Sequence, residues 1–270
     1  MTEANRAYLG LDIGSAASKC AIIDETGELV GRGIYPSGAG TPGPERALAD
    51  ALGAASLTLE QIAFSCATGY GRHLIEWTDC EMSELSCHAR GAVELFGPVR
   101  TVIDIGGQDA KVLSLGDDGA LQNFVMNDKC AAGTGRFLDV MAQVFGCATK
   151  DLSGLDTRSI EPAAISSTCT VFAESEVISK LAQGVEIANI VAGVHESVVD
   201  RTVGLAKRVG IAAPIALTGG VALNDSLRRR LSDRIGAPIM TSPLAQMNGA
   251  LGAALIARQK AGYQKTTPTA

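Results

Sequence analysis

The sequence predicts an α/β fold with two duplicated domains. Three observations lead to this prediction. Apolar runs of strand length alternate with runs of helical period, one hairpin pattern occurs twice, and a double glycine follows a late apolar run. The chain has 270 residues, of which 46% are hydrophobic. That length suits two domains of roughly 100–150 residues each.

The charge balance and the N-terminal residues exclude several classes of protein. The net charge of −6 argues against a nucleic-acid binder, because such proteins usually carry a basic excess. Residues 1–6 lack the basic and apolar regions of a signal peptide. The uncharged part of residues 235–257 is interrupted by prolines and polar side chains, so it does not predict a membrane span. We therefore expect a cytoplasmic protein that binds neither nucleic acid nor membrane.

The first hairpin pattern lies near the N-terminus. A strand ends at Asp12, small residues fill the turn at 15–18, and Lys19 precedes the next apolar run. The pattern returns over residues 101–112, with every matched position shifted by 92. The matched pairs are Asp12 with Asp104, Gly14 with Gly106, Lys19 with Lys111, and Gly27 with Gly119. A fixed shift without gaps predicts an internal duplication.

Such a hairpin has the chemistry of a phosphate-binding loop. Glycine and small residues let backbone N–H groups approach a phosphate closely, and an Asp at the strand end can hold a hydrated Mg²⁺. Two facing loops would clamp one polyphosphate from both sides. The alternative is that both hairpins are ordinary tight turns.

The segment between the hairpins contains ordinary elements of an α/β domain. Residues 44–52 and 84–95 have amphipathic helical patterns, and residues 62–67 form an apolar strand pattern. The polar turn at 68–72 is compatible with a cleft or with a plain loop. Gly97 and Pro98 predict a domain boundary before the second hairpin.

Two of the seven cysteines stand directly before helical patterns. Cys130 precedes Gly133, Thr134 and an amphipathic run, and Cys169 precedes another. Helix N-termini stabilise thiolates, so both cysteines are candidate ligands. Iron–sulfur clusters and structural zinc usually take four ligands, so two cysteines are too few for such a site. A symmetric dimer in which each chain contributes Cys130 and Cys169 would complete the set. The alternative is two capped helices with incidental thiols. The odd cysteine number without a C-x-x-C pair does not indicate a disulfide framework.

The last third of the sequence predicts a nucleoside-facing turn. Residues 187–209 form a long helical pattern containing His195, which we interpret as a surface or structural residue. An apolar strand at 215–218 then leads into Gly219, Gly220 and Asn224. This order suits a backbone that passes close to a nucleoside before the next helix.

These segments together resemble a known family. The duplicated D-I-G hairpins and the late T-G-G motif resemble the actin-like (ribonuclease H-like) superfamily of actin, heat-shock chaperone ATPases and sugar kinases. Within it, N-D-K-C-A-A-G-T-G-R-F-L-D-V-M and I-S-S-T-C-T-V-F-A-E-S-E-V-I-S resemble the ATP-dependent activators of 2-hydroxyacyl-CoA dehydratases. These activators are relatives of the ATPase subunits of benzoyl-CoA reductases. The resemblance extends to A-T-G-Y-G-R, M-S-E-L-S-C-H-A and S-P-L-A-Q-M-N-G-A-L-G-A-A-L.

The resemblance implies an ATPase coupled to electron transfer. It implies a homodimer with one [4Fe-4S] cluster held by Cys130 and Cys169 of both subunits, and ATP or ADP with Mg²⁺ in each nucleotide cleft. Ferredoxin or flavodoxin would reduce the protein. ATP hydrolysis would then drive one low-potential electron to a partner iron–sulfur acyl-CoA dehydratase or reductase. A protein of this kind is expected to be oxygen-sensitive and to act in anaerobic metabolism.

The resemblance also assigns roles and boundaries. Asp12 and Asp104 are expected to hold Mg²⁺ and organise water, and Gln108 to orient the attacking water. The expected nucleotide-binding residues are Gly14, Ser15, Ala16, Ser18, Lys19, Gly106, Gly107, Gly133, Thr134, Gly219, Gly220, Asn224 and Gln246. The expected parts are an N-terminal domain (1–97), a second domain with the cluster cysteines (98–246), a helix packing back on the first domain (247–262) and a tail (263–270).

Other functions remain open at the level of sequence. The acceptor could be a benzoyl-CoA reductase or a double-cubane-cluster protein in place of a dehydratase. A small-molecule kinase would share the hairpins but would have no use for the two cysteine turns. A scaffold or chaperone-type switch is disfavoured, because no length remains for a peptide-binding domain.

Overall fold

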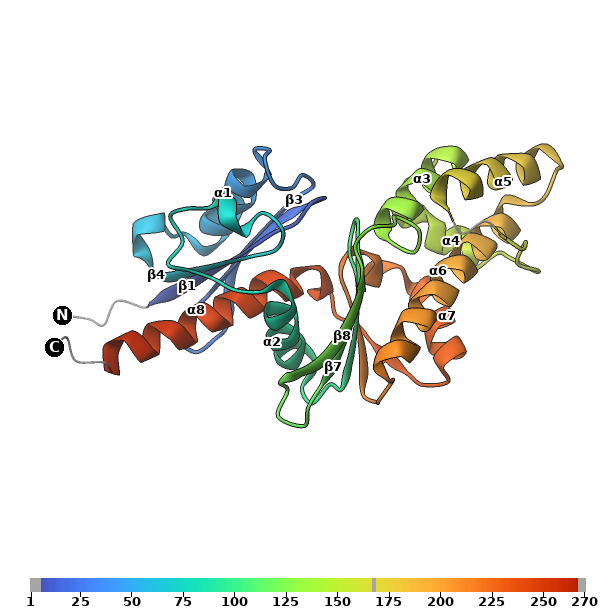
Figure 1. Ribbon diagram of the computed structural model, residues 1–270. Coiled ribbons are helices and arrows are strands. Elements are labelled where there is room, and N and C mark those ends of the chain that lie inside the picture. The colour runs from blue at the N-terminus through green and yellow to red at the C-terminus, as the bar shows by residue number, and fades with distance from the viewer. Residues whose placement is uncertain (1–5, 167–168, 267–270) are drawn as a thin grey trace. The chain divides into compact units, whose positions relative to one another are not determined.

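The computed structural model describes residues 6–166 and 169–266, which divide into two compact units. Unit 1 contains the residues up to Gly97 and those from Met247 onward, and unit 2 contains Pro98–Gln246. Each unit has one five-stranded sheet with helices packed on it (Figure 1). The predicted α/β class with a duplicated architecture is confirmed. No helix within the described ranges combines the length and apolar character that a membrane span requires.

The sheet of unit 1 has the strand order β3-β2-β1-β4-β5. Strand β1 pairs antiparallel with β2 and parallel with β4. The elements of this unit are β1 (Ala7–Ile13), β2 (Ser18–Ile23), β3 (Leu29–Tyr35), α1 (Gly43–Ala55), η1 (Leu59–Gln61), β4 (Ile62–Thr68), η2 (Arg72–Leu74), β5 (Cys80–Glu81), α2 (Glu84–Phe96) and α8 (Asn248–Thr266).

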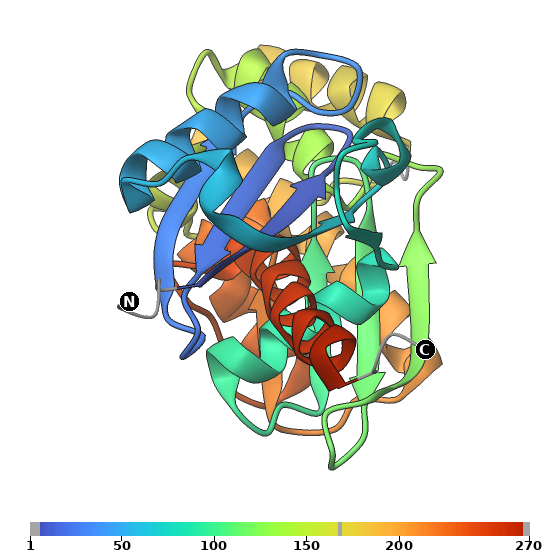
Figure 2. The same cartoon turned by 90° about the vertical axis from the view of Figure 1, so that its left-hand side faces the viewer.

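Side chains along β1 alternate between the two faces of the sheet, so successive residues contact different helices. Leu9, Leu11 and Ile13 belong to the apolar cluster shared with α1. Gly10 points to the other face, where a Cβ would come within 2.1 Å of the Ala250 carbonyl of α8. Helix α8 lies across this face of the sheet (Figure 2). Asp12, two residues after Gly10, therefore lies on the α8 side of the sheet.

Helix α8 is longer than the sequence predicted. It ends at Thr266, so residues 263–266 of the expected tail belong to the helix. The physical reason is that this segment contains Gln264 and Lys265, which favour helix, and no proline before Pro268. Residues 267–270 of the expected tail lie outside the described residues.

The sheet of unit 2 has the order β10-β9-β6-β7-β8, with β6 antiparallel to β7 and parallel to β9. The elements are β6 (Thr101–Ile105), β7 (Ala110–Leu115), β8 (Leu121–Asn127), α3 (Gly135–Phe145), η3 (Thr149–Asp151), α4 (Leu152–Asp156), α5 (Thr170–Ala182), α6 (Ile187–Val209), β9 (Ile215–Thr218), η4 (Gly220–Leu223), α7 (Asp225–Ile235) and β10 (Ile239–Met240). The short helix η5 (Ala245–Met247) follows, and its last residue, Met247, belongs to unit 1.

The core of unit 2 joins one face of this sheet to several helices. Phe137 and Met141 of α3 pack with Ile103 and Ile105 of β6, in a cluster that also includes Val177 of α5. Helices α3 and α5 lie side by side in Figure 1. Each Val, Leu, Ile, Phe or Met side chain that this core fully removes from water contributes about 1.5–3 kcal/mol. The two helices that follow Cys130 and Cys169 are therefore held by a shared core.

Candidate functional site

The two hairpin turns have the same geometry. Asp12 faces Lys19 across β1 and β2, and Asp104 faces Lys111 across β6 and β7. Both turns are also closed by the same backbone hydrogen bond. The Gly14 N–H donates to the Ala17 carbonyl at 3.1 Å, and the equivalent Gly106 N–H donates to the Asp109 carbonyl at 2.9 Å. Residues that are 92 positions apart in the sequence therefore occupy equivalent positions in the two hairpins.

In unit 1, Asp12 lies among small residues and close to a helix N-terminus. The Asp12 side chain is 4% exposed, and its Oδ2 atom lies 3.0 Å from Lys19 Nζ. A Cβ on Gly249, in the first turn of α8, would come within 2.8 Å of Asp12 Oδ2 and 2.9 Å of His88 Nε2. A Cβ on Gly69 would come within 2.7 Å of Asp12 Oδ1. The positive end of the α8 dipole adds to the ammonium in stabilising the Asp12 carboxylate.

The predicted residues in the first turn differ in exposure. Ser15 and Ala16 are exposed at the tip of the turn, where their backbone can meet a phosphate. Ser18 is buried, and its hydroxyl donates to the Ser37 carbonyl at 2.9 Å. This hydrogen bond holds the loop that contains Ser37 against the turn. Sequence reasoning missed Gly69 and Gly249, because their role depends on contacts across more than fifty residues.

In unit 2, Asp104 lies in a denser polar cluster. Lys111 Nζ lies 3.4 Å from Asp104 Oδ2 and 2.8 Å from Asp109 Oδ2, and the lysine side chain is 2% exposed. The Thr218 hydroxyl donates to Asp104 Oδ1 at 2.7 Å. The carboxylate is thereby fixed from β7 and from β9. Gln108, at the tip of the turn, is exposed and can reach a water molecule.

The second turn is bonded directly to the beginning of α3. The Gly135 N–H donates to the Gly106 carbonyl at 2.8 Å, and the Arg136 N–H donates to the Gly107 carbonyl at 2.7 Å. A Cβ on Gly135 would also come within 3.6 Å of Val221. These N–H groups belong to the first turn of a helix, where no intrahelical partner exists. The phosphate-loop candidate therefore supplies the hydrogen-bond acceptors for the N-terminus of α3.

The double glycine follows β9 beside the same turn. Gly219 has φ +84°, and a Cβ there would come within 2.3 Å of the Ile105 carbonyl, so this position requires glycine. Gly220 is exposed and lies against the Gln246 side chain. Asn224 follows at the N-terminus of α7, where its side chain accepts a hydrogen bond from the Leu227 N–H at 2.9 Å. The structure thus brings Gly220 and Gln246 together.

His195 is buried, so the surface interpretation of this residue is wrong and the structural one holds. Its ring bonds to Asp156 and lies 3.1 Å from the Asn224 amide nitrogen. Asp156 is buried, which opposes its ionisation, but hydrogen bonds from His195 and Arg230 outweigh this effect and hold the pKa of the carboxyl well below its usual range. The same contact raises the pKa of Arg230. Sequence reasoning missed Asp156 and Arg230, because they lie 39 and 35 positions from His195 with no motif between them.

The two candidate ligand cysteines are exposed. Cys169 occupies the N-cap position of α5. Cys130 lies five residues before α3, in a turn held by Asn127 Nδ2, which donates to the Cys130 carbonyl at 2.8 Å. Thr134 is fully buried and donates to the Ala131 carbonyl at 2.6 Å, so its hydroxyl also holds this turn. Gly133 is buried at φ +85° against Arg201.

The donor sets fit the groups that the resemblance implies. Mg²⁺ in nucleotide sites typically takes one or two carboxylates plus phosphate oxygens, which suits Asp12 or Asp104. Among the described residues no group of three His, Cys, Asp or Glu side chains could hold a metal ion. Two exposed thiols on one chain fit a group whose remaining ligands come from a second chain.

The family of the chain follows from comparison with known proteins. Residues 9–257 match the BadF/BadG/BcrA/BcrD ATPase family. The chain belongs to this family. The resemblance found in the sequence is thereby confirmed, and the chain is a member of an ATPase family.

Members of the BadF/BadG/BcrA/BcrD family with known roles are similar over most of the chain. The (R)-2-hydroxyglutaryl-CoA dehydratase activating ATPase of Acidaminococcus fermentans is 54% identical over 254 residues, which are 94% of this chain and 97% of that protein. A benzoyl-CoA reductase subunit of Thauera aromatica is 33% identical over 217 residues, 78% of this chain and 77% of that protein.

Solved structures agree with the family. The activator of the 2-hydroxyisocaproyl-CoA dehydratase from Clostridium difficile, with bound ADPNP, superposes with a TM-score of 0.94 and 47% identity, covering 98% of this chain and 99% of that one. A ROK family glucokinase from Streptomyces griseus gives a TM-score of 0.53 at 17% identity, covering 94% of this chain and 99% of that one. At that identity the glucokinase shows only that the two proteins share a fold, as expected from the sequence.

Proposed function

We propose that this BadF/BadG/BcrA/BcrD ATPase is an ATP-driven one-electron donor that activates a 2-hydroxyacyl-CoA dehydratase. The observation that carries the proposal is the bonding of α3 to the candidate phosphate loop. Gly106 and Gly107 accept hydrogen bonds from the first N–H groups of α3, and Cys130 lies just before that helix. A change at the loop on ATP binding or hydrolysis would therefore move the N-terminus of α3 and the turn that holds Cys130.

The chain's own residues have distinct tasks in the proposed hydrolysis of ATP to ADP and phosphate. The backbone N–H groups of the two glycine turns bind phosphate oxygens, and the Lys19 and Lys111 ammonium groups pair with the Asp12 and Asp104 carboxylates. Exposed Gln108 orients the attacking water. Gly219, Gly220, Asn224 and Gln246 contact the nucleoside. Mg²⁺ on the carboxylates would supply charge neutralisation for the phosphates.

Cys130 and Cys169 are the proposed ligands of a [4Fe-4S] cluster shared by two copies of the chain. Such a cluster supplies one-electron redox chemistry at a potential that depends on its exposure and on hydrogen bonds to its sulfur atoms. Helix α5 supports a shared site, because next to Cys169 it exposes apolar side chains. Val171, Phe172 and Ile178 are 65%, 68% and 50% exposed. An exposed apolar face of this kind favours contact with a second subunit.

In the proposed reaction, electrons flow from a small redox protein through this ATPase to the dehydratase. A ferredoxin or flavodoxin gives one electron to the protein, and the protein passes one electron to the iron–sulfur component of the dehydratase. ATP hydrolysis makes the uphill transfer favourable. The activating relative from Acidaminococcus fermentans, at 54% identity, supports a dehydratase as the acceptor.

The experiment is anaerobic purification followed by iron analysis and a coupled assay. We expect a brown dimer with about four iron atoms per two chains. With ATP, Mg²⁺ and a chemical reductant, it should reduce and activate a 2-hydroxyacyl-CoA dehydratase, and omission of ATP should abolish the activation. A colourless, iron-free protein that transfers phosphate to a small molecule would contradict the proposal and favour the kinase.

A second candidate acceptor is a benzoyl-CoA reductase or a double-cubane-cluster protein. The 33% identity to the benzoyl-CoA reductase subunit of Thauera aromatica supports it. Both candidates predict the same cluster and the same ATP dependence. They differ in the acceptor, so parallel assays with a dehydratase component and a benzoyl-CoA reductase core discriminate between them.

A further inference from the structure

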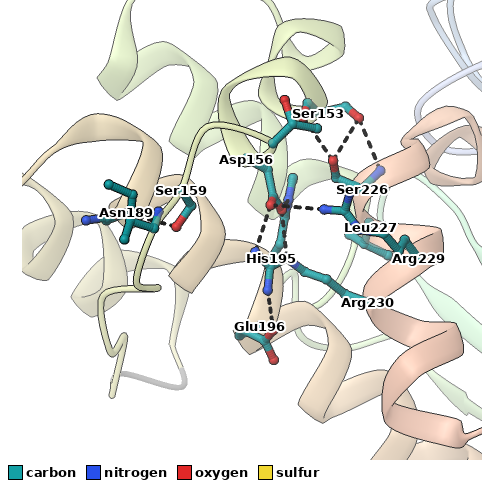
Figure 3. Close-up of polar contacts among 12 residues, drawn as sticks. Ser153, Asp156, Ser159, Asn189, His195, Glu196, Ser226, Leu227, Arg229 and Arg230 are labelled. Atoms are coloured by element: carbon teal, nitrogen blue, oxygen red, sulfur yellow. Dashed lines mark hydrogen bonds and ion pairs between the residues drawn. The ribbon is translucent and has the colours of Figure 1, made fainter.

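A buried chain of polar side chains runs from the interior of unit 2 to Asn224. His195, on α6, is 0% exposed. On one side its Nδ1 atom bonds to Asp156 Oδ2, and on the other its Nε2 atom lies 3.1 Å from Asn224 Nδ2. Figure 3 shows the Asp156 carboxylate between the side chains of His195 and Arg230. Three helices, α4, α6 and α7, meet at this point.

The orientation of the Asn224 amide determines the tautomer of His195. Asn224 Oδ1 accepts the hydrogen bond from the Leu227 N–H at 2.9 Å. The NH₂ group therefore faces His195, and a donor there requires His195 Nε2 to be the acceptor. The ring proton must then be on Nδ1, where it is donated to Asp156. Each ring nitrogen of His195 thus has a defined hydrogen-bond partner.

Asp156 is itself held rigidly. Arg230 donates to both of its carboxylate oxygens, from Nε at 2.8 Å and from Nη2 at 2.7 Å. Arg230 also donates to Glu196 Oε1 at 2.5 Å, and Arg229 Nη2 lies 3.7 Å from Asp156 Oδ1. A bidentate arginine–carboxylate pair fixes geometry as well as charge. The His195 ring is therefore locked in place from the side opposite Asn224.

We propose that His195 is a positioning residue for nucleotide binding, which acts by holding the Asn224 side chain. The inference rests on the proposed role of Asn224 as a nucleoside contact. The Asn224 amide has two N–H bonds, and His195 accepts only one of them. Asn224 Oδ1 accepts from the Leu227 N–H, and one Nδ2 N–H donates to His195 Nε2. These two bonds fix the plane of the amide, and so they also fix the direction of its second N–H bond. A nucleoside acceptor atom in that direction binds without the entropic cost of ordering the amide.

The test uses a pair of histidine replacements that keep different nitrogens. His195→Asn places an amide near the Nδ1 position and keeps the contact to Asp156, but it removes the acceptor for Asn224. His195→Gln places an amide oxygen near the Nε2 position and keeps that acceptor. The readout is the dissociation constant of Mg·ADP, measured by calorimetry on the whole chain, with Asn224→Ala and the double variant His195→Asn/Asn224→Ala in parallel.

The expected results separate positioning from general stability. Asn224→Ala and His195→Asn should each weaken ADP binding by about 5- to 10-fold, the loss of roughly one hydrogen bond. The double variant should bind no more weakly than Asn224→Ala alone, and His195→Gln should bind almost normally. In steady-state hydrolysis, His195→Asn should raise KM for ATP and leave kcat unchanged. Additive losses in the double variant, or normal binding by His195→Asn beside weakened binding by Asn224→Ala, would overturn the inference.

A measurement on the unaltered protein covers the case in which His195→Asn does not fold. The chain has only three histidines, so the ¹⁵N side-chain signals of His195 are identified by their loss in His195→Gln. We expect the ring proton on Nδ1, Nε2 as a hydrogen-bond acceptor, and a shift of the Nε2 signal when Mg·ADP saturates the protein. A proton on Nε2, or no shift at saturation, would contradict the inference. The ADP titration does not involve iron, so failure of the proposed electron transfer would leave it unaffected, and unchanged binding by Asn224→Ala would instead refute the nucleoside contact itself.

Discussion

The Lys111 ammonium lies 3.4 Å from the Asp104 carboxylate, at the register at which Lys19 faces Asp12 in the first hairpin. The two pairs differ in burial. Lys111 is 2% exposed and also lies 2.8 Å from Asp109, whereas Lys19 is 17% exposed. The duplicated hairpin therefore has a more deeply buried charge cluster in unit 2 than in unit 1.

Replacement of Lys111 by methionine should destabilise the protein strongly. It would leave Asp104 and Asp109 buried without this cation, at a cost of about 3–5 kcal/mol in the free energy of unfolding. Urea unfolding measures the loss. Lys19→Met is the matched control and should lose less, because water screens the more exposed Lys19 pair. Equal losses in the two variants would contradict the difference in burial.

Asp104→Asn should separate hydrolysis from cluster binding. The replacement keeps an acceptor for the Thr218 hydroxyl, so the fold should persist, but it removes the charge proposed to organise Mg²⁺ and water. We expect phosphate release to fall by about 100-fold, with an unchanged iron content. Asp117→Asn, at a side chain that is 92% exposed, is the control. Loss of iron in Asp104→Asn would show that the two roles are not separate.

Cys130→Ser and Cys169→Ser should each abolish cluster binding and electron delivery. Both thiols are exposed, and each is one of the two that a chain would contribute. Cys147→Ser is the matched control, because burial raises the pKa of the Cys147 thiol and makes it a poorer ligand. Iron analysis after anaerobic purification measures the effect. A full complement of iron in either ligand variant would refute the shared site.

Gly135→Ala should uncouple the phosphate loop from α3. The added Cβ would come within 3.0 Å of the Gly106 carbonyl, so the loop or the helix must shift. We expect ATP-dependent electron delivery to fall by about 10- to 100-fold, as for other misplaced catalytic groups. Gly204→Ala is the control, because a Cβ at that exposed helical position meets nothing within 4 Å. If both variants kept full activity, the hydrogen bonds between loop and helix would not transmit the change.

Asp156 should make stability depend on pH in the acid range. Its pKa is lowered in the folded state, so its contribution is fully present above the ordinary pKa of an aspartate, about 3.9, and is lost as pH falls through the folded pKa. Urea unfolding of the parent and of Asp156→Asn at pH 7, 4 and 3 measures this contribution. We expect a large difference at pH 7 that shrinks below about pH 4. If the stability difference between the parent and Asp156→Asn grew on acidification, the lowered pKa of Asp156 in the folded state would be contradicted.

The cysteine and glycine segments could be recognised from the sequence because their chemistry is local. Asp12 and Lys19 are seven positions apart, so a hairpin brings them together without help from the rest of the fold. Cys130 and Cys169 each stand beside their own helix start. The interpretation of His195 remained open for the opposite reason, since a lone histidine in a helix carries no local signal. Similarly, the helical pattern at 84–95 is compatible with Cys87 and His88 on the helix surface or at the edge of the core, whereas the structure buries both in unit 1.

The α/β class, the duplicated hairpins and the two cysteine turns can all be predicted from the order of residues, because they depend on residue type at short and fixed spacings. The distant groups that complete these features are known only from the fold. The polar chain from Arg230 through Asp156 and His195 to Asn224 joins three helices of unit 2, and the N-terminus of α3 finds its acceptors at Gly106 and Gly107. Buried polar groups need hydrogen-bond partners, and the packing of the whole fold determines which groups lie close enough to pair.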